Sequence, residues 1–155
     1  MYYLDDQYII QEYCYTEGHP WYQGSTGTLK AKASPLSRLG AIIYQDQEGN
    51  HLRVYYQGEW NLSPSRHAFV ETAEEDKTNI VRELAYDGKW HMGEMQIKTA
   101  TVGTGIASVT YVADNMRQIR VYYQSSDLSL REYCHNNKGW FAGKFAGSVC
   151  PHSGH

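Results

Sequence analysis

The sequence predicts an all-β fold built from β-propeller blades, each made of four antiparallel strands. Fourteen tyrosines and fourteen glycines, with only four prolines among 155 residues, favour short strands joined by tight turns. One order of residues also recurs: "LRVYYQ" at 52–57 and "IRVYYQ" at 119–124 each precede a glutamate and then a tryptophan. Tyr3, Tyr56 and Tyr123 mark successive copies, and a spacing of roughly 50 residues is typical of a propeller blade.

The elements follow from aligning the copies. The first copy, "MYYLDDQYIIQEYCYTEGHPWYQGS", supplies only the last three strands of a blade, whereas the next two copies supply four each. The chain is long enough for one core, so we expect a single domain over residues 1–155. Its expected parts are a partial blade at 1–27, a blade at 28–98 with an insert at 58–78, a blade at 99–146 and a tail at 147–155.

Composition and charge exclude several classes of function. The formal net charge of -3 comes without a basic block, so nucleic acid is not an expected partner. The start "MYYLDDQYII" has neither a cationic segment nor a long apolar run, so we expect no signal peptide and no membrane span. The expected location is therefore the cytoplasm, or outside the cell after unconventional secretion.

The cysteines give no sign of a metal or a disulfide. Cys14 and Cys134 occupy equivalent positions in successive copies, which seldom meet, so we do not expect a disulfide between them. The sequence has no Cys-x-x-Cys pair and no histidines at ligand spacing. We therefore expect no metal and no cofactor.

The repeated arginine and glutamate are predicted to face each other across a hairpin. Paired residues in an antiparallel hairpin have a constant sum of numbers, and a turn centred at Ser126 would place Arg120 directly opposite Glu132. The same alignment pairs Arg53 with Glu83, with the insert forming the hairpin loop. In each pair, both side chains would then point to one face of the sheet.

Two interpretations of these pairs compete. A cross-strand ion pair at a surface contributes only about 0.2 to 1 kcal/mol to stability. In the functional interpretation, the guanidinium donates hydrogen bonds, the carboxylate accepts them and the following indole offers an apolar platform. Together these groups suit a sugar, whose hydroxyls need donors and acceptors and whose C–H face packs on an aromatic ring. The recurrence of all three in one order favours the sugar.

The pattern "IRVYYQ…LREY…GWFAG" resembles the blade repeat of the fungal fucose-specific lectin family, of the orange peel mushroom lectin type, which is related to small bacterial fucose-binding lectins. The resemblance implies a six-bladed propeller that binds L-fucose in fucosylated glycans or glycoproteins, at sites between adjacent blades. It also implies which residues bind the sugar. They are Arg53, Glu83 and Trp90 in one site, Arg120, Glu132 and Trp140 in a second, and Glu12 and Trp21 in a third.

The third site is expected to be defective unless another chain completes it, because the arginine that matches Glu12 would stand before Met1. The chain also has fewer repeats than a six-bladed ring needs. Two chains, each adding one strand from residues 147–151, would supply enough strands to close a ring. We therefore expect a homo-oligomer, preferably a head-to-tail dimer.

Two alternatives to a non-enzymatic lectin stay open. The first is a glycoside hydrolase in which Glu12, Glu83 or Glu132 is the acid, although one carboxylate per site leaves no second carboxylate to act as nucleophile or base. The second is a propeller that binds proteins and uses the arginine–glutamate pairs only for structure.

Overall fold

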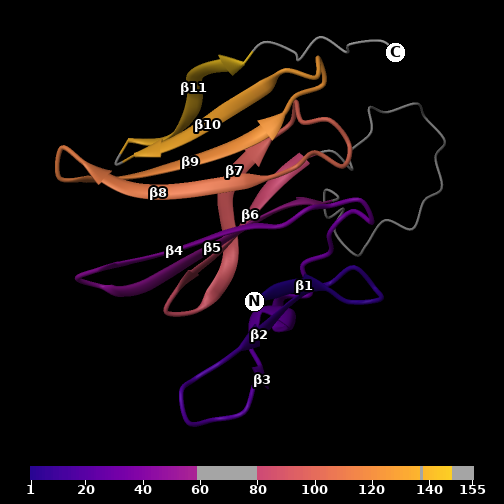
Figure 1. Ribbon diagram of the computed structural model, residues 1–155, viewed down its shortest axis with the longest axis vertical. Helices are drawn as coiled ribbons and strands as arrows, with labels where there is room; N and C mark the ends of the chain where they lie inside the picture. The colour runs from indigo at the N-terminus through magenta and orange to yellow at the C-terminus, as the bar shows by residue number, and fades with distance from the viewer. Residues whose placement is uncertain (59–79, 137, 148–155) are drawn as a thin grey trace, which may run out of the picture.

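The computed structural model shows three antiparallel sheets that follow one another in chain order, from the lower to the upper part of Figure 1. It describes residues 1–58, 80–136 and 138–147. The first sheet has three strands in the order β1-β2-β3. They are β1 (Tyr2–Leu4), β2 (Ile10–Cys14) and β3 (Tyr22–Gln23), and a short 3-10 helix, η1 (Thr26–Leu29), follows them.

The second and third sheets have four strands each, ordered β4-β5-β6-β7 and β8-β9-β10-β11. The second contains β4 (Gly40–Asp46), β5 (Gly49–Gly58), β6 (Ile80–Asp87) and β7 (Trp90–Ile97). The third contains β8 (Ala107–Ala113), β9 (Met116–Gln124), β10 (Leu130–Asn136) and β11 (Gly139–Gly147). The prediction of an all-β chain with an incomplete first copy and two four-stranded copies is confirmed.

The glutamine of the repeated "YYQ" anchors the loops between sheets. The backbone N–H of Gln57 donates to Oγ of Ser37 (2.9 Å), and the N–H of Gln124 donates to Oγ1 of Thr104 (2.7 Å). Gln57 is also buried and donates through Nε2 to the carbonyl of Thr101 at 2.8 Å. These bonds attach each four-stranded sheet to the segment that precedes it. The repeated glutamine therefore makes the same connection in both sheets.

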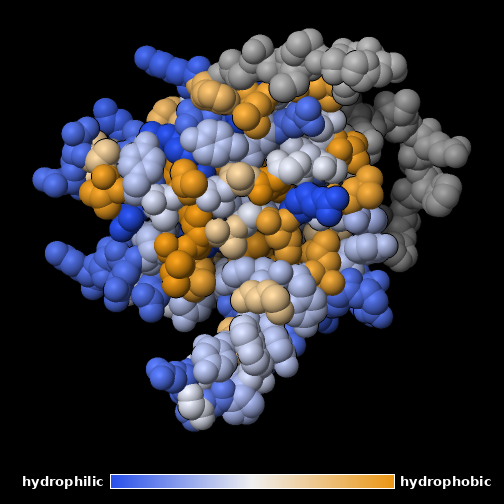
Figure 2. Space-filling view, viewed as in Figure 1, coloured by the Kyte–Doolittle hydropathy of each residue, from blue (hydrophilic) through white to orange (hydrophobic). Residues whose placement is uncertain are grey.

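Two apolar cores lie between the sheets, because the strands of the middle sheet carry buried residues on both faces. Figure 2 shows apolar residues gathered over the centre of the molecule, with hydrophilic residues on the protruding hairpin ends. The core between the first and second sheets contains Ile10, Ala31, Ala33, Val54, Tyr56, Leu84 and Trp90. The core between the second and third contains Ile42, Tyr55, Val81, Met95, Ile97, Ala100, Ile119, Val121 and Tyr123.

The register of the hairpins differs from the prediction by one pair. Glu132 pairs with Tyr122 and Arg120 pairs with Cys134, so the turn centre lies at Asp127 and not at Ser126. In the second sheet Glu83 likewise pairs with Tyr55. The predicted direct opposition of arginine and glutamate is therefore wrong. The two side chains still share a face, because a diagonal shift of two residues keeps the alternation.

Other expectations meet the structure only in part. β11 extends through Gly147, the first residue of the expected tail, whereas the rest of the tail and the insert after Gly58 lie outside the described residues. Cys14 and Cys134 are both free thiols. Within the described residues, no helix is long and apolar enough to cross a membrane.

Candidate functional site

A pocket lies between the second and third sheets and encloses about 290 Å³. The second sheet contributes Arg53 from β5 and Glu83 from β6, and the third contributes Trp140 from β11. The volume falls at the lower end of the range for small-molecule sites. The remaining lining residues are Tyr44, Ala85, Asp87, His91, Met92, Gly93, Glu94, Ile119 and His135.

The arginine and glutamate meet diagonally in both four-stranded sheets. Nε of Arg53 lies 3.7 Å from Oε1 of Glu83, and Nε of Arg120 lies 3.5 Å from Oε1 of Glu132. Each guanidinium also donates through Nη1 to the carbonyl of its preceding residue, Leu52 or Ile119. The shared geometry shows that the sequence repeat is also a repeat of side-chain placement.

Arg53 is fixed by further partners that the sequence alignment missed. Its Nη2 donates to the hydroxyl of Tyr44 and forms an ion pair with Oδ1 of Asp87, both at 2.9 Å. The ring of His51 lies between Asp87 and Asp46, within hydrogen-bonding distance of each. Burial opposes ionisation of Asp87, but hydrogen bonds from His51 and Arg53 outweigh it and lower the pKa of this carboxyl. The same bond to Asp87 raises the pKa of His51.

Glu83 is almost fully buried, with 4% of its surface exposed. Burial raises its pKa to about 7, although the charge of Arg53 acts in the opposite direction. Its Oε1 atom is buried beside Nε of Arg53, and the hydroxyl of the directly opposite Tyr55 favours the charged form of this carboxyl. Glu83 lines the pocket, and a carboxylate has several lone pairs, so this residue is a candidate acceptor for a ligand hydroxyl.

A glycine lies against each of the three repeated glutamates. A Cβ atom on Gly93 would lie 2.1 Å from Oε2 of Glu83, and one on Gly143 would lie 2.2 Å from Oε2 of Glu132. Gly24 stands in the same relation to Glu12, at 2.2 Å. The strand registers shift at Glu83 and at Glu132, where the facing strand bulges. The glycine therefore gives each carboxylate the room to lie along the bulge.

Trp90 and Trp140 each face the preceding sheet, and not the arginine and glutamate of their own repeats. Trp140 lines the pocket of Arg53 and Glu83 and packs edge-on against Tyr55, with ring centroids 6.2 Å apart. Trp90 is not among the described residues that line this pocket. Its ring packs edge-on against Tyr2 of the first sheet, at 5.9 Å. The predicted grouping of Arg53 and Glu83 with Trp90 is therefore corrected, because the two faces of one sheet serve two different interfaces.

The first sheet carries Glu12 and Trp21 on opposite faces. Glu12 accepts hydrogen bonds from the hydroxyls of Tyr2 (2.9 Å) and Thr26 (3.2 Å). Trp21 is 50% exposed and stacks on Tyr13, which points to the other face by strand alternation. Both residues border a larger hollow of about 670 Å³ beside β1, although no single face presents them together.

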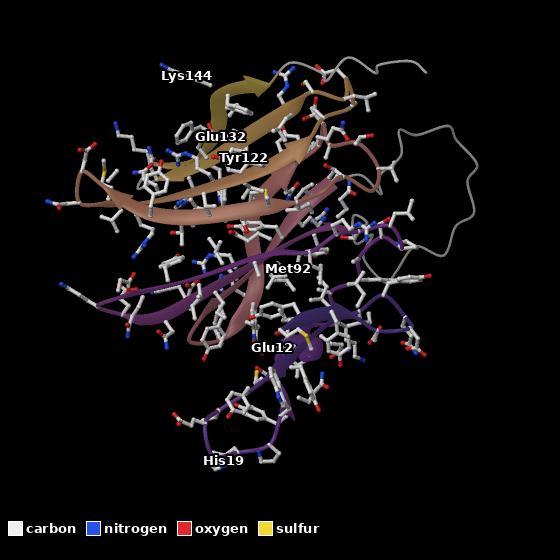
Figure 3. All side chains as sticks on the ribbon, in the orientation of Figure 1. Glu12, His19, Met92, Tyr122, Glu132 and Lys144 are labelled. Atoms are coloured by element: carbon white, nitrogen blue, oxygen red, sulfur yellow. The ribbon has the colours of Figure 1, made fainter. Side chains whose placement is uncertain are left out.

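Arg120 and Glu132 lie on a face that no described element covers. The hydroxyl of Tyr122 donates to Oε1 of Glu132 at 3.1 Å, and the guanidinium of Arg120 lies over the ring of Tyr111. Figure 3 shows Glu132 and Tyr122 close together in the sheet farthest from Glu12. The described part of the chain places no tryptophan opposite this pair, because Trp140 belongs to the other face of the sheet.

The Arg53 pocket thus offers a guanidinium, a buried carboxylate oxygen and an indole, as the sugar hypothesis requires. The expectation of one carboxylate per site is wrong here, because Asp87 also lines the pocket. The sequence could have pointed to Asp87, because it stands four residues after Glu83, at the end of β6. The equivalent position in the next copy is Asn136, so this carboxylate does not repeat. Oδ1 of Asp87 is already engaged by Arg53 and His51.

Comparisons with known proteins agree with this geometry. The protein-family model described as "Fungal fucose-specific lectin" matches residues 1–65 and 65–153. A curated relative, the fucose-specific lectin of Aleuria aurantia, is 28% identical over 151 residues, which cover 96% of this chain and 42% of the relative. This chain therefore spans about two fifths of the length of that relative.

Solved structures show the same architecture. The Aleuria aurantia lectin, described as a six-bladed β-propeller with a novel mode of fucose recognition, matches 95% of this chain and 41% of its own, with a TM-score of 0.73 and 26% identity. A fucose lectin from Kordia zhangzhouensis is 23% identical and matches 94% of this chain and 89% of its own, with a TM-score of 0.72. The fold prediction is confirmed: the three sheets are propeller blades.

Proposed function

Because this chain belongs to the fungal fucose-specific lectin family, a family of non-enzymatic carbohydrate-binding proteins, we propose that it binds L-fucose in fucosylated glycans. The observation that carries the proposal is the pocket in which Arg53 and Glu83 of one blade face Trp140 of the next. The guanidinium of Arg53 donates to sugar hydroxyls, the carboxylate of Glu83 accepts from one, and the indole packs on the C–H face and methyl group. Arg120 and Glu132 form the polar half of a second site, in which the hydroxyl of Tyr122 holds Glu132 in place.

Titration calorimetry with α-methyl-L-fucoside tests this proposal. We expect saturable binding that glucose does not compete for, reduced by Arg120→Ala and weakened further by about 10- to 100-fold when Trp140→Ala is added. Asp6→Ala, at an exposed position in the turn between β1 and β2, is the control and should bind as the natural protein does. A chromogenic fucoside should remain intact. Absence of fucoside binding, together with capture of a protein partner, would favour the protein-binding alternative.

We propose further that a second copy of the chain completes the propeller. The outer face of the third blade leaves Val109, Tyr111, Phe141 and Phe145 exposed, and the outer face of the first blade leaves Tyr15 and Trp21 exposed. Trp21 occupies the place in its blade that Trp140 occupies in the third. The stacking on the preceding tyrosine supports this equivalence, since Tyr13–Trp21 and Tyr133–Trp140 both have centroids 5.6 Å apart and rings 7° from parallel.

In such a head-to-tail pair, Trp21 of one copy would stand opposite Arg120 and Glu132 of the other. The same contact would hide exposed apolar surface and gather several sites on one rigid ring, raising avidity by roughly 10² to 10⁴. The expected extra strand at 147–151 lies outside the described residues except for Gly147, which already belongs to β11. This proposal keeps the expected division of the single domain into a partial blade at 1–27, blades at 28–98 and 99–146, and a tail at 147–155.

Light scattering on the purified chain should give twice the chain mass of 17.8 kDa. Val109→Asp, on the outer face of the third blade, should give a monomer because it places a charge in the interface. Leu36→Asp is a matched control, since Leu36 is also exposed but lies in the loop before β4, beside Gly103. A monomer that binds fucose at both sites would contradict the closed pair, and a trimer would require a different number of blades.

A further inference from the structure

The two arginine sites differ in charge at equivalent positions. Asp87 corresponds to Asn136, because each stands four residues after the repeated glutamate, at the ends of β6 and β10. The same alignment places Glu94 and Lys144 one residue after the glycines that touch the glutamates. Two acidic side chains in one blade thus correspond to an amide and a cation in the next.

The Arg53 pocket has an excess of negative groups. Its lining contains one guanidinium, from Arg53, against the carboxyl groups of Glu83, Asp87 and Glu94. Asp87 is held ionised by Arg53 and His51, and its Oδ2 lies 3.6 Å from Nε2 of His91. The positive charge of Arg53 is already balanced by the carboxylates of Asp87 and Glu83, even when Glu83 is partly protonated. An anionic ligand would therefore gain little attraction from this guanidinium.

The other charged groups near the pocket do not reverse this balance. Burial lowers the pKa of His135, which therefore stays neutral at pH 7. Arg117 of the third blade lies over the ring of Tyr44, with its guanidinium carbon 4.8 Å from the centroid, but it is not among the lining residues. His51, whose pKa is raised by Asp87, lies between Asp87 and Asp46 and is balanced by these two carboxylates, so the field inside the pocket is still set mainly by the carboxylates.

The Arg120 site has the opposite balance. Nη2 of Arg120 donates to Oε1 of Gln118, a neutral group, at 3.2 Å, and Glu132 is the carboxylate beside it. Lys144 is exposed and projects from the outer edge of the sheet in Figure 3. Asp127, at the end of the same hairpin, is paired with Arg131 at 2.8 Å and adds no net charge.

We propose that the two sites sort fucosylated glycans by charge. The Arg53 pocket selects neutral glycans and disfavours those with a carboxylate or sulfate on the sugar next to the fucose, whereas the Arg120 site accepts such anionic glycans. Asp87 and Glu94 are the residues that determine the specificity of the first site, and Asn136 and Lys144 those of the second. This inference rests on the proposed function, because it assumes that fucose occupies both sites.

The size of the effect is the one expected for charges in contact with water, since Glu94 and Lys144 are both exposed. Like charges several ångströms apart in a partly hydrated environment should change affinity by about 3- to 10-fold. Salt should reduce this discrimination strongly, because the Debye length falls to about 3 Å at 1 M ionic strength. A preference caused by shape alone would persist in salt.

The experiment measures each site in isolation. Arg120→Ala leaves the Arg53 pocket, and Trp140→Ala leaves the Arg120 site. Each protein is titrated with α-methyl-L-fucoside, with a neutral fucosylated trisaccharide, and with its sialylated and sulfated forms. Glu94→Lys and Asp87→Asn are added to the first protein, and Lys144→Glu and Asn136→Asp to the second. Glu17→Lys, which makes the same charge change in a distant exposed hairpin, is the control for Glu94→Lys.

We expect the Arg53 pocket to bind the neutral trisaccharide about 3- to 10-fold more tightly than the anionic forms. Glu94→Lys and Asp87→Asn should remove this preference, and Lys144→Glu should create it in the Arg120 site, whereas Glu17→Lys should change nothing. Equal ratios in both sites, or ratios that these variants leave unchanged, would overturn the inference alone. Absence of methyl fucoside binding to the natural protein would overturn the proposed function and the inference with it.

Discussion

The Arg53 and Arg120 positions carry the same repeat, yet only the first forms an enclosed site within one chain. In both, an arginine meets a glutamate diagonally across a hairpin, at 3.7 and 3.5 Å. The difference lies in what faces them. The third blade covers Arg53 and contributes Trp140, whereas no described element covers Arg120. A blade therefore supplies the polar half of one site and the aromatic half of another, so a site belongs to the interface between two blades.

The largest expected effect comes from removing the aromatic half of the Arg53 pocket. In an Arg120→Ala background, Trp140→Ala should reduce the affinity for α-methyl-L-fucoside by about 10- to 100-fold, because the sugar loses its apolar platform. Calorimetry measures this loss. Trp21→Ala is the matched comparison, since Trp21 lies on the outer face of the first blade and should leave this pocket unaffected. Equal losses in the two variants would contradict the division of each site between neighbouring blades.

The next effect concerns the glycine that accommodates the carboxylate. Gly93→Ala would place a Cβ atom 2.1 Å from Oε2 of Glu83, so the carboxylate or the strand must move. Such overpacking should cost about 1 to 3 kcal/mol of stability and weaken fucoside binding in the same pocket. Thermal unfolding and calorimetry check both. Gly105→Ala is the control, because no atom lies within 4 Å of its Cβ position. If Gly93→Ala behaves like Gly105→Ala, the close approach of Glu83 is wrong.

A smaller effect should appear in the pH dependence of stability. The pKa of Glu83 in the fold is about 7, above its ordinary value of 4.5, so folding favours the neutral carboxyl. The stabilisation of the neutral form is complete below the ordinary pKa and is lost as the pH rises through 7. Relative to Glu83→Gln, the free energy of unfolding of the natural protein should therefore fall by about 2 to 3 kcal/mol between pH 4.5 and pH 8. Parallel curves in denaturant titrations of the two proteins would show that Glu83 is not desolvated.

The smallest expected effect is that of a chelator. All the contacts proposed for the sugar are side-chain donors, acceptors and rings, in both arginine sites. Excess EDTA should therefore leave the affinity for α-methyl-L-fucoside unchanged in calorimetry. A loss of binding that added calcium restores would mean that the polar half of the site has been misread.

Much of the fold could be predicted from the sequence, because the repeat fixed the number and order of strands. The copies around Tyr56 and Tyr123 became four-stranded sheets, and the first copy formed three strands as expected. The register was off by one pair, because the sequence alone does not reveal that the turn between β9 and β10 spans 125–129 and is centred on Asp127. The recurring tyrosine two residues after each arginine could have corrected it, since Tyr122 lies directly opposite Glu132.

The partners within each site were harder to predict, because sites between repeats cannot be grouped by order along the chain. Trp90 follows Glu83 in sequence but points to the other face of the sheet, toward Tyr2. Only the stacking of sheets shows that Trp140 completes the Arg53 pocket. The ion pair of Arg53 with Asp87 also occurs in one copy, because Asn136 stands at the equivalent position of the next. The pattern of repeated residues therefore does not reveal Asp87.

A crystal structure of the protein with α-methyl-L-fucoside tests the central claim most directly. The division of each site between neighbouring blades predicts a sugar whose hydroxyls contact Arg53 and the carboxylate of Glu83 and whose C–H face lies on Trp140. If two copies close a ring, a second sugar should lie between Arg120 and Trp21 of the other copy. A sugar held by Glu83 and Trp90, or bound only outside the interfaces between blades, would contradict the account.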